Sequence, residues 1–204
     1  MNLVPCLKFA GLSFCRVGAI ACVASLLFTC GCHQRTERET FLQYKAKATK
    51  GNGVAQKNLA NCYFAGQGVT QDYSEAVNWY RKAAEQNVSG AQVQLGYCYE
   101  NGKGVEKDDA EAVKWHRKAA EQNNVAGQLS LSKHYADGTG VEKNCVEAYA
   151  LINLVAKTHG PYGSLHDDLG NLEKQMSPHQ VAAGNKRMRE LEAQIAANSK
   201  SGGK

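Results

Sequence analysis

The sequence has no apolar run long enough to cross a bilayer. The apolar stretch near its start, from Val17 to Phe28, carries no charge and follows Lys8 and Arg16, whereas a membrane-spanning helix needs about 20 apolar residues. A short apolar stretch after basic residues is typical of a secretory signal. We therefore expect residues 1–32 to direct export and to take no part in the fold.

Dense positive charge is also missing. The chain has 24 lysines and arginines and 19 acidic residues, a formal net charge of +5. This falls to +3 without residues 1–32, which contain Lys8 and Arg16 and no acid. A nucleic-acid-binding protein is expected to carry a basic stripe, but here lysines and glutamates interleave. The composition therefore argues against nucleic acid as a partner.

Recognisable catalytic and metal-binding motifs are absent as well. No CxxC pair occurs, and the Gly-x-Gly segments lack the strand and the Lys-Ser/Thr of a phosphate-binding loop. None of the six histidines is spaced with a carboxylate or cysteine as in a metal site or triad, and we interpret His116 and His134 as packed helix residues. The sequence predicts no catalytic residue, no cofactor and no metal. The histidines are His33, His116, His134, His159, His166 and His179.

What the sequence does contain is a 36-residue unit that occurs three times. Copies starting at Ala55 and Ala91 are nearly intact, and a copy starting at Gly127 is degenerate. A fixed period of about 20 to 50 residues indicates a solenoid, in which each unit stacks on its neighbours to bury its apolar face. Residues recurring in phase include Tyr63, Tyr99 and Tyr135; Gly66, Gly102 and Gly138; and Gly68, Gly104 and Gly140.

Each unit reads as two helices joined by a glycine turn. Apolar residues from Ala55 to Tyr63 and from Ala76 to Ala84 recur with helical spacing. Gly66 and Gly68 can take the positive φ that ends the first helix and turns the chain back. Capping boxes are predicted to start the second helices, formed by Asp72 with Glu75, Asp108 with Glu111, and Asn144 with Glu147.

These features divide the chain into a signal, a stack of units and a closing segment. Residues 39–51 match the second helix of a unit, and Ser177 followed by Pro178 is a strong helix start. The expected segments are a signal of lipoprotein type at 1–32, a tether at 33–38, a half repeat at 39–51, repeats at 53–88, 89–124 and 125–160, capping helices at 164–197 and a disordered tail at 198–204.

The repeated pattern resembles the Sel1-like repeat family, a relative of the tetratricopeptide repeat. The resemblance covers about residues 39 to 160. It implies an all-α, right-handed solenoid of stacked antiparallel helix pairs that assembles other proteins and has no common catalytic site. The third unit departs from the pattern at Gly127, Leu151 and Val155, as terminal repeats commonly do.

The residues around Cys32 resemble the cleavage box of bacterial lipoproteins, in which a small residue precedes the cysteine that is lipidated. Gly31 precedes Cys32 and suits this pattern, although Thr29 and Cys30 suit it less well. We expect a lipid-anchored protein of the cell envelope that faces the periplasm or the exterior. A cleaved, secreted protein and an uncleaved anchor are the alternatives.

Three cysteines lie beyond the signal, so at least one cannot pair with the others. Cys62 and Cys98 share one repeat position on an inward face, and we interpret both as small buried apolar residues. A disulfide between them would need Cα atoms within about 7 Å, whereas stacked helices lie about 8 to 10 Å apart. Cys145 starts a helix, but its neighbour Asn144 offers no base to activate it.

The first helices of such units line the concave side of a solenoid, where a peptide can bind. An apolar strip flanked by lysines is expected there, which would suit a partner with apolar and acidic groups. The alternative is that these residues contact the next repeat. The predicted partner-binding residues are Lys57, Asn61, Val93, Tyr97, Leu129 and Lys133.

Two classes of function follow from these observations. The first is a non-enzymatic scaffold at the cell envelope that binds a protein or peptide. The second is a cell-wall-active or β-lactam-binding protein, as described for some cysteine-rich relatives, but the chain shows no acylable serine or cysteine in a recognisable pocket. The identity of the partner and the oligomeric state are left open.

Overall fold

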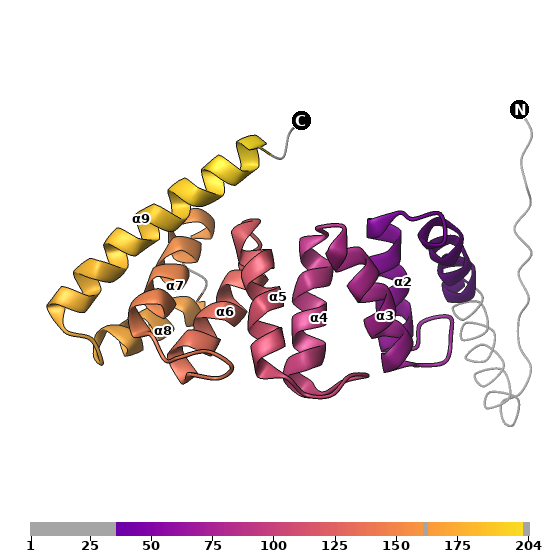
Figure 1. The fold of residues 1–204 in the computed structure, drawn as a ribbon, viewed down its shortest axis with the longest axis horizontal. Helices are drawn as coiled ribbons and strands as arrows, with labels where there is room; N and C mark the ends of the chain where they lie inside the picture. Colours follow the sequence, from indigo (N-terminus) through magenta and orange to yellow (C-terminus); the bar gives the residue numbers. More distant parts are fainter. Residues whose placement is uncertain (1–35, 161–162, 202–204) are drawn as a thin grey trace, which may run out of the picture.

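The structure is a row of antiparallel helix pairs. The computed structural model describes residues 36–160 and 163–201, so the predicted signal and Cys32 lie outside the described residues. Within them all regular structure is helical, which confirms the all-α, right-handed solenoid. The helices stand side by side in Figure 1. They are a helix at 36–48, α2 (Gly53–Ala65), α3 (Tyr73–Glu85), α4 (Ser89–Asn101), α5 (Asp109–Glu121), α6 (Val125–Asp137), α7 (Cys145–His159), α8 (Gly163–Glu173) and α9 (Pro178–Ser201).

Alanines at recurring positions form much of the core, because their small side chains let neighbouring helices approach closely. The residues predicted to face inward on α3 are all buried, and Tyr80 among them is only 1% exposed. Its hydroxyl donates a hydrogen bond to Asn61 Oδ1 at 2.6 Å. The buried hydroxyl of Tyr80 therefore has the hydrogen-bond partner that a buried polar group requires.

Only half of each predicted capping box forms. The Asp72 carboxylate accepts from the backbone N–H of Glu75 at 3.0 Å. The N–H of Asp72, which a full box would pair with the Glu75 side chain, instead donates to the carbonyl of Tyr63 at 2.9 Å. The start of α3 is thereby tied to the end of α2, and Asp108 and Asn144 repeat both contacts in the later units.

Buried glutamines link the units. Gln92 is fully buried, and its amide donates to the carbonyl of Ala84 in the preceding unit at 3.1 Å. Its Oε1 accepts from Gln122 Nε2 at 2.7 Å. Gln56 and Gln86 form the same pair one unit earlier, also at 2.7 Å. A buried amide with both ends satisfied fixes the register between helices in a way that apolar packing alone does not.

The degenerate third unit loses this pair. Gln128 is also fully buried, but the position equivalent to Gln122 holds Thr158, whose hydroxyl bonds the carbonyl of Leu154 at 2.9 Å. Gln128 Nε2 donates to Asn123 Oδ1 at 3.2 Å, and its Oε1 has no hydrogen-bond partner among the described residues.

The second glycine of each turn lets successive units approach closely. Gly104 has φ +71°, and a Cβ built on it would lie 2.2 Å from the carbonyl oxygen of Tyr73, the first residue of α3. Gly68 and Gly140 stand in the same relation to Glu37 and Asp109. The turn of each unit therefore lies against the backbone of the preceding helical layer, with no room for a side chain.

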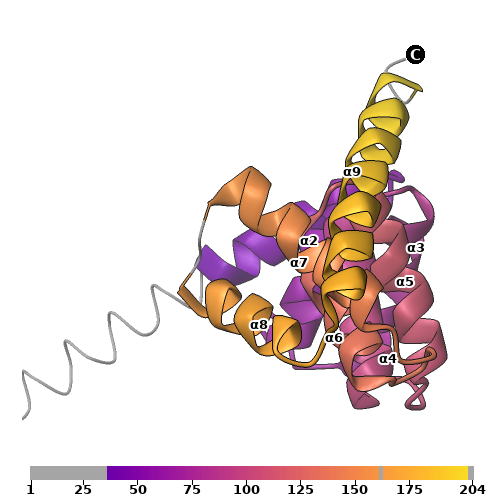
Figure 2. The same ribbon diagram turned by 90° about the vertical axis from the view of Figure 1, so that its left-hand side faces the viewer.

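The C-terminal helices close the stack. The predicted helix start is confirmed, since the Ser177 N–H donates to Gln180 Oε1 at 2.8 Å and the Gln180 N–H donates to Ser177 Oγ at 3.3 Å. Helix α9 packs on α7 where a Cβ on Gly184 would lie 2.6 Å from the Tyr149 ring. In Figure 2 its last turns extend beyond the stacked units.

The structure corrects two boundaries at the ends of the stack. Residues 36–38, expected to belong to a tether, are helical and continuous with the helix that extends to residue 48. The tail expected to be disordered from Asn198 is helical as far as Ser201. None of the helices in the described ranges is long and apolar enough to span a membrane.

We expect Gly104→Ala to destabilise the protein more than Gly102→Ala. Both glycines have positive φ, so both substitutions incur about 1–2 kcal/mol of left-handed strain. Only Gly104→Ala also places a Cβ against backbone, which adds about 1–3 kcal/mol, because a Cβ on Gly102 meets nothing closer than 3.5 Å. Urea unfolding followed by circular dichroism measures the difference, and equal losses in the two variants would contradict the inter-unit contact.

Candidate functional site

Tyr97 is an exposed aromatic ring that is held in place. Its exposed fraction is 37%, which places it with Leu42 and Val54 among the exposed large hydrophobic residues of the described chain. The ring packs edge-on against Phe64 with centroids 6.1 Å apart, and Lys103 Nζ lies 5.3 Å from its centroid. An ordered aromatic ring at the surface is a common binding feature, because little side-chain entropy is lost when a partner covers it.

The predicted surface residues on α2 are less available. Asn61 is half-buried and already accepts a hydrogen bond from the Tyr80 hydroxyl, so its side chain stabilises the fold. Lys57 is half-buried, and its Cδ would lie 3.4 Å from a Cβ on Gly90 of α4. Val93, also predicted to contact a partner, is half-buried on α4.

Leu129 and Lys133 lie at a hollow between α6, α7 and α8. The hollow has a volume of about 530 Å³, and its apolar lining includes Leu129, Ile152 and Leu172. Lys133 is exposed at its edge, with Nζ 3.7 Å from Glu100 Oε1. The structure thus brings two of the six predicted residues to one hollow, whereas Lys57, Asn61, Val93 and Tyr97 do not line it.

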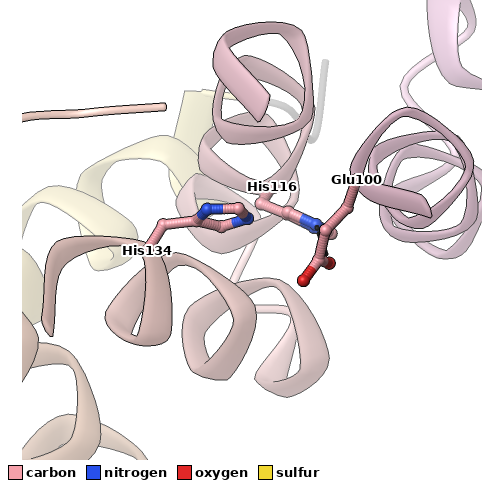
Figure 3. A group of neighbouring side chains, drawn as sticks. All are labelled: Glu100, His116 and His134. Carbon is pink, nitrogen blue, oxygen red and sulfur yellow. Dashed lines mark ion pairs between the residues drawn. The ribbon is translucent and has the colours of Figure 1, made fainter. Parts of the chain in front are cut away.

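A cluster of polar side chains that the sequence did not predict lies between the second and third units. Glu100 on α4, His116 on α5 and His134 on α6 each offer one ligand atom, and these atoms lie within 4.8 Å of one another. Figure 3 shows the three side chains pointing toward one another. Both histidines do occupy packed positions, as predicted, with exposed fractions of 1% and 2%. The spacing of histidines along the chain gave no signal, because the three residues come from three different helices.

The His134 ring has a defined orientation. Its Nδ1 lies 2.9 Å from both the carbonyl oxygen and Oγ1 of Thr139. Because a carbonyl oxygen can only accept, Nδ1 carries the proton and Nε2 presents a lone pair. This Nε2 is buried and has no hydrogen-bond partner among the described residues.

His116 is a neutral, buried imidazole. Burial lowers its pKa to about 4, and the neighbouring His134 lowers it as well. Neither ring nitrogen has a hydrogen-bond partner in the described part of the chain, although Nε2 lies 4.0 Å from Glu100 Oε2. Neutral imidazole is the form that binds metal ions, and a buried polar group without a partner is costly.

Two of the three cysteines in the described units, Cys62 and Cys98, are poor nucleophiles. Cys62 and Cys98 are free and buried, which confirms the prediction that they pack as small apolar residues without a disulfide. Burial raises the pKa of the Cys98 thiol to about 11, against a smaller lowering by Lys103. Burial and the charge of Glu37 raise the pKa of Cys62. Cys145 is half-buried at the first position of α7.

We expect Cys98 to react with a thiol reagent at pH 8 at least about a hundredfold more slowly in the native protein than in urea, because its thiolate is scarce and covered. Cys145 is the internal comparison and should be labelled first of the three. Mass spectrometry of labelled peptides from the full chain resolves each cysteine. Labelling of Cys98 as rapid as that of Cys145 would show that the core opens readily.

Comparison with known proteins identifies a matching repeat family and similar solved structures. The model of the Sel1 repeat matches residues 53–88, 89–124 and 125–154. The crystal structure of c5321, described as a protective antigen present in uropathogenic Escherichia coli strains and displaying an SLR fold, superposes with a TM-score of 0.71 at 31% identity, over 78% of this chain and 33% of that one. A Sel1 repeat protein from Oxalobacter formigenes superposes with a TM-score of 0.61 at 32% identity, over 74% of this chain and 59% of that one. A search of curated proteins gives no match.

The chain therefore spans about a third of the first of these proteins and about three fifths of the second. Proteins built from Sel1 repeats generally serve as scaffolds for protein interaction and are typically not enzymes. The repeat boundaries found from the sequence at residues 53, 89 and 125 coincide with those of the matched units. This chain is a member of the Sel1 repeat family.

Proposed function

We propose that the protein is a scaffold at the bacterial cell envelope that binds a peptide segment of a partner protein. The observation that carries this proposal is the apolar hollow beside Lys133, lined by Leu129, Ile152 and Leu172. An apolar side chain of a partner would fill the hollow, and polar groups of the partner would meet Lys133, Asp137 and Asp168 in its lining. Tyr97, exposed on α4, is a second contact in this proposal.

The envelope location rests on the leader sequence. Val17 to Phe28 supplies the apolar region of a signal, and Gly31 precedes the cysteine that would carry the lipid, Cys32. The description of the relative c5321 as a protective antigen also supports a location outside the cytoplasm. A lipidated Cys32 would hold the stack close to the membrane, since residue 36, four positions after it, is already helical.

The main test is cross-linking in cells of the tagged full-length protein, followed by mass spectrometry of the proteins that copurify. A Tyr97→Ala, Lys133→Ala protein should lose the partner by about tenfold or more, because both contacts lie on the proposed surface. The matched control is Leu42→Ala, Lys50→Ala, which removes an exposed hydrophobic residue and an exposed lysine at the other end of the stack. Equal recovery from the two variants would contradict the proposed surface.

The same cells test the anchor. Cys32→Ala should shift the protein from the membrane fraction to the soluble fraction, whereas Cys30→Ala should leave it membrane-bound. If Cys32→Ala stays in the membrane fraction to the same extent as the wild type, Cys32 is not the anchor.

The wall-active alternative requires an activated nucleophile. Cys62 and Cys98 are buried with raised pKa values, which argues against acylation of either thiol. We expect no hydrolysis of nitrocefin by the purified protein above a heat-denatured control. Turnover that survives repeated purification would overturn the assignment as a non-enzymatic scaffold.

A further inference from the structure

The boundary between the second and third units differs in chemistry from the equivalent boundary between the first and second. At the first boundary Phe64, Tyr80 and Cys98 belong to one apolar cluster, with the two rings 6.4 Å apart. One repeat later, the same three positions hold Glu100, His116 and His134. Three apolar or weakly polar side chains are thus replaced together by a carboxylate and two imidazoles.

A fourth replacement makes room for this cluster. A Cβ on Gly96 would lie 2.6 Å from His116 Cε1 and 2.8 Å from its Nε2, so the imidazole rests on the backbone of α4. The equivalent position in the first unit is Ala60. Four departures from the repeat therefore meet at one point, although they lie on α4, α5 and α6.

The ligand atoms point inward and lack other partners. Nε2 of His134 presents a lone pair, because Nδ1 of the same ring is held by Thr139. His116 is 1% exposed, and neither of its ring nitrogens has a hydrogen-bond partner among the described residues. A metal-bound imidazole usually donates its other N–H to a backbone carbonyl or a carboxylate, which fixes the tautomer and the ring orientation. The Thr139 carbonyl does this for His134.

The distances fit a site that closes around an ion. Zinc binds imidazole nitrogen and carboxylate oxygen at about 2.0 to 2.2 Å, which places tetrahedral donors about 3.4 Å apart. His116 Nε2 and Glu100 Oε2 are 4.0 Å apart, and all three donors lie within 4.8 Å. Side-chain rotations that bring the donors about 1 Å closer would complete the geometry. The Glu100 side chain is 28% exposed, so the site is open to solvent on that side.

We propose that Glu100, His116 and His134 bind zinc or a similar divalent transition metal at the boundary of the second and third units. Two imidazoles and one carboxylate suit such ions and disfavour magnesium and calcium, which prefer oxygen ligands. Three protein ligands leave a fourth position for water. Lys133, with Nζ 3.7 Å from Glu100 Oε1, competes with the ion for the carboxylate.

The test is a titration of the metal-free, full-length protein with zinc and with cobalt(II), followed by calorimetry, thermal unfolding and the visible spectrum of cobalt. We expect one ion per chain, a higher Tm in its presence, and cobalt bands of nitrogen and oxygen ligation. Thiolate ligation would give an additional intense near-ultraviolet band, which separates this site from the cysteines near the N-terminus.

The variants identify the ligands. Glu100→Gln and His134→Gln should each weaken binding by about tenfold or more, because each removes a donor atom. The control His159→Gln changes an exposed histidine and should bind as the wild type does. Lys133→Gln should bind more tightly, because it removes the cation that pairs with Glu100. A purely structural polar cluster would give no such gain.

Glu100→Gln keeps the shape of a partly exposed side chain, so it remains informative if His134→Gln fails to fold. Absence of binding in the wild type would overturn the proposal. So would binding that is unchanged in Glu100→Gln and His134→Gln, or a cobalt spectrum dominated by thiolate.

Discussion

The backbone of each unit lies in contact with the backbone of the layer before it. Gly104 leaves no space for a side chain between its turn and Tyr73, and the same contact recurs at Gly68 and Gly140. Because this contact repeats with the sequence period, the offset between neighbouring units is similar at both boundaries, although α6 has Gly127 where α4 has Ala91, and a Cβ on Gly127 would lie 2.7 Å from that of Ala119. The offset decides which residues of different units meet. With this offset the Gln92 amide donates a hydrogen bond to the carbonyl of Ala84, as the Gln56 amide does to the carbonyl of Ala48.

The similar offset also explains why substituted residues from different units lie next to one another. Positions 64, 80 and 98 meet at the first boundary, so positions 100, 116 and 134 must meet at the second. A change of residue type at any of them therefore alters one shared environment. The apolar cluster of the first boundary stabilises the stack mainly by burial, and its one buried hydroxyl, that of Tyr80, has a hydrogen-bond partner in Asn61. The polar cluster of the second cannot do so, and its buried, unpartnered nitrogens are better explained by a ligand.

The period in the sequence was sufficient to predict the helix pairs, the glycine turns and the inward faces of α2 and α3, because these features depend on contacts within one unit. It was not sufficient for contacts between residues far apart in the sequence, whether these lie within one unit or in different units. Three features depend on such distant partners. They are the bond from the Asp72 N–H to Tyr63 in place of Glu75, the pairing of Gln92 with Gln122, and the cluster around His116. The C-terminal end of α9 was placed too early, since no repeat defines it. Its side chains nevertheless contact the stack, as in the ion pair of Arg187 with Glu147 at 2.7 Å.

The residues predicted to contact a partner differ in how accessible they are. Leu129 and Lys133 lie at one hollow and Tyr97 is exposed, whereas Asn61 is committed to Tyr80. The sequence could identify which residues face away from their own helix pair, but it could not show which of them the next unit or α8 would cover. Lys133 lies between the hollow and the cluster of Glu100, His116 and His134, because it lines the hollow and pairs with Glu100.

Repeat geometry brings Glu100, His116 and His134 together, and we propose that they act together as ligands of one ion. This can be measured by X-ray absorption at the zinc edge, on the full-length protein loaded with one equivalent of zinc. We expect a first shell of nitrogen and oxygen at about 2.0 to 2.2 Å with the outer-shell scattering of two imidazoles, reduced to one in His134→Gln. A first shell of sulfur at about 2.3 Å, or an imidazole signal that His134→Gln leaves unchanged, would contradict it.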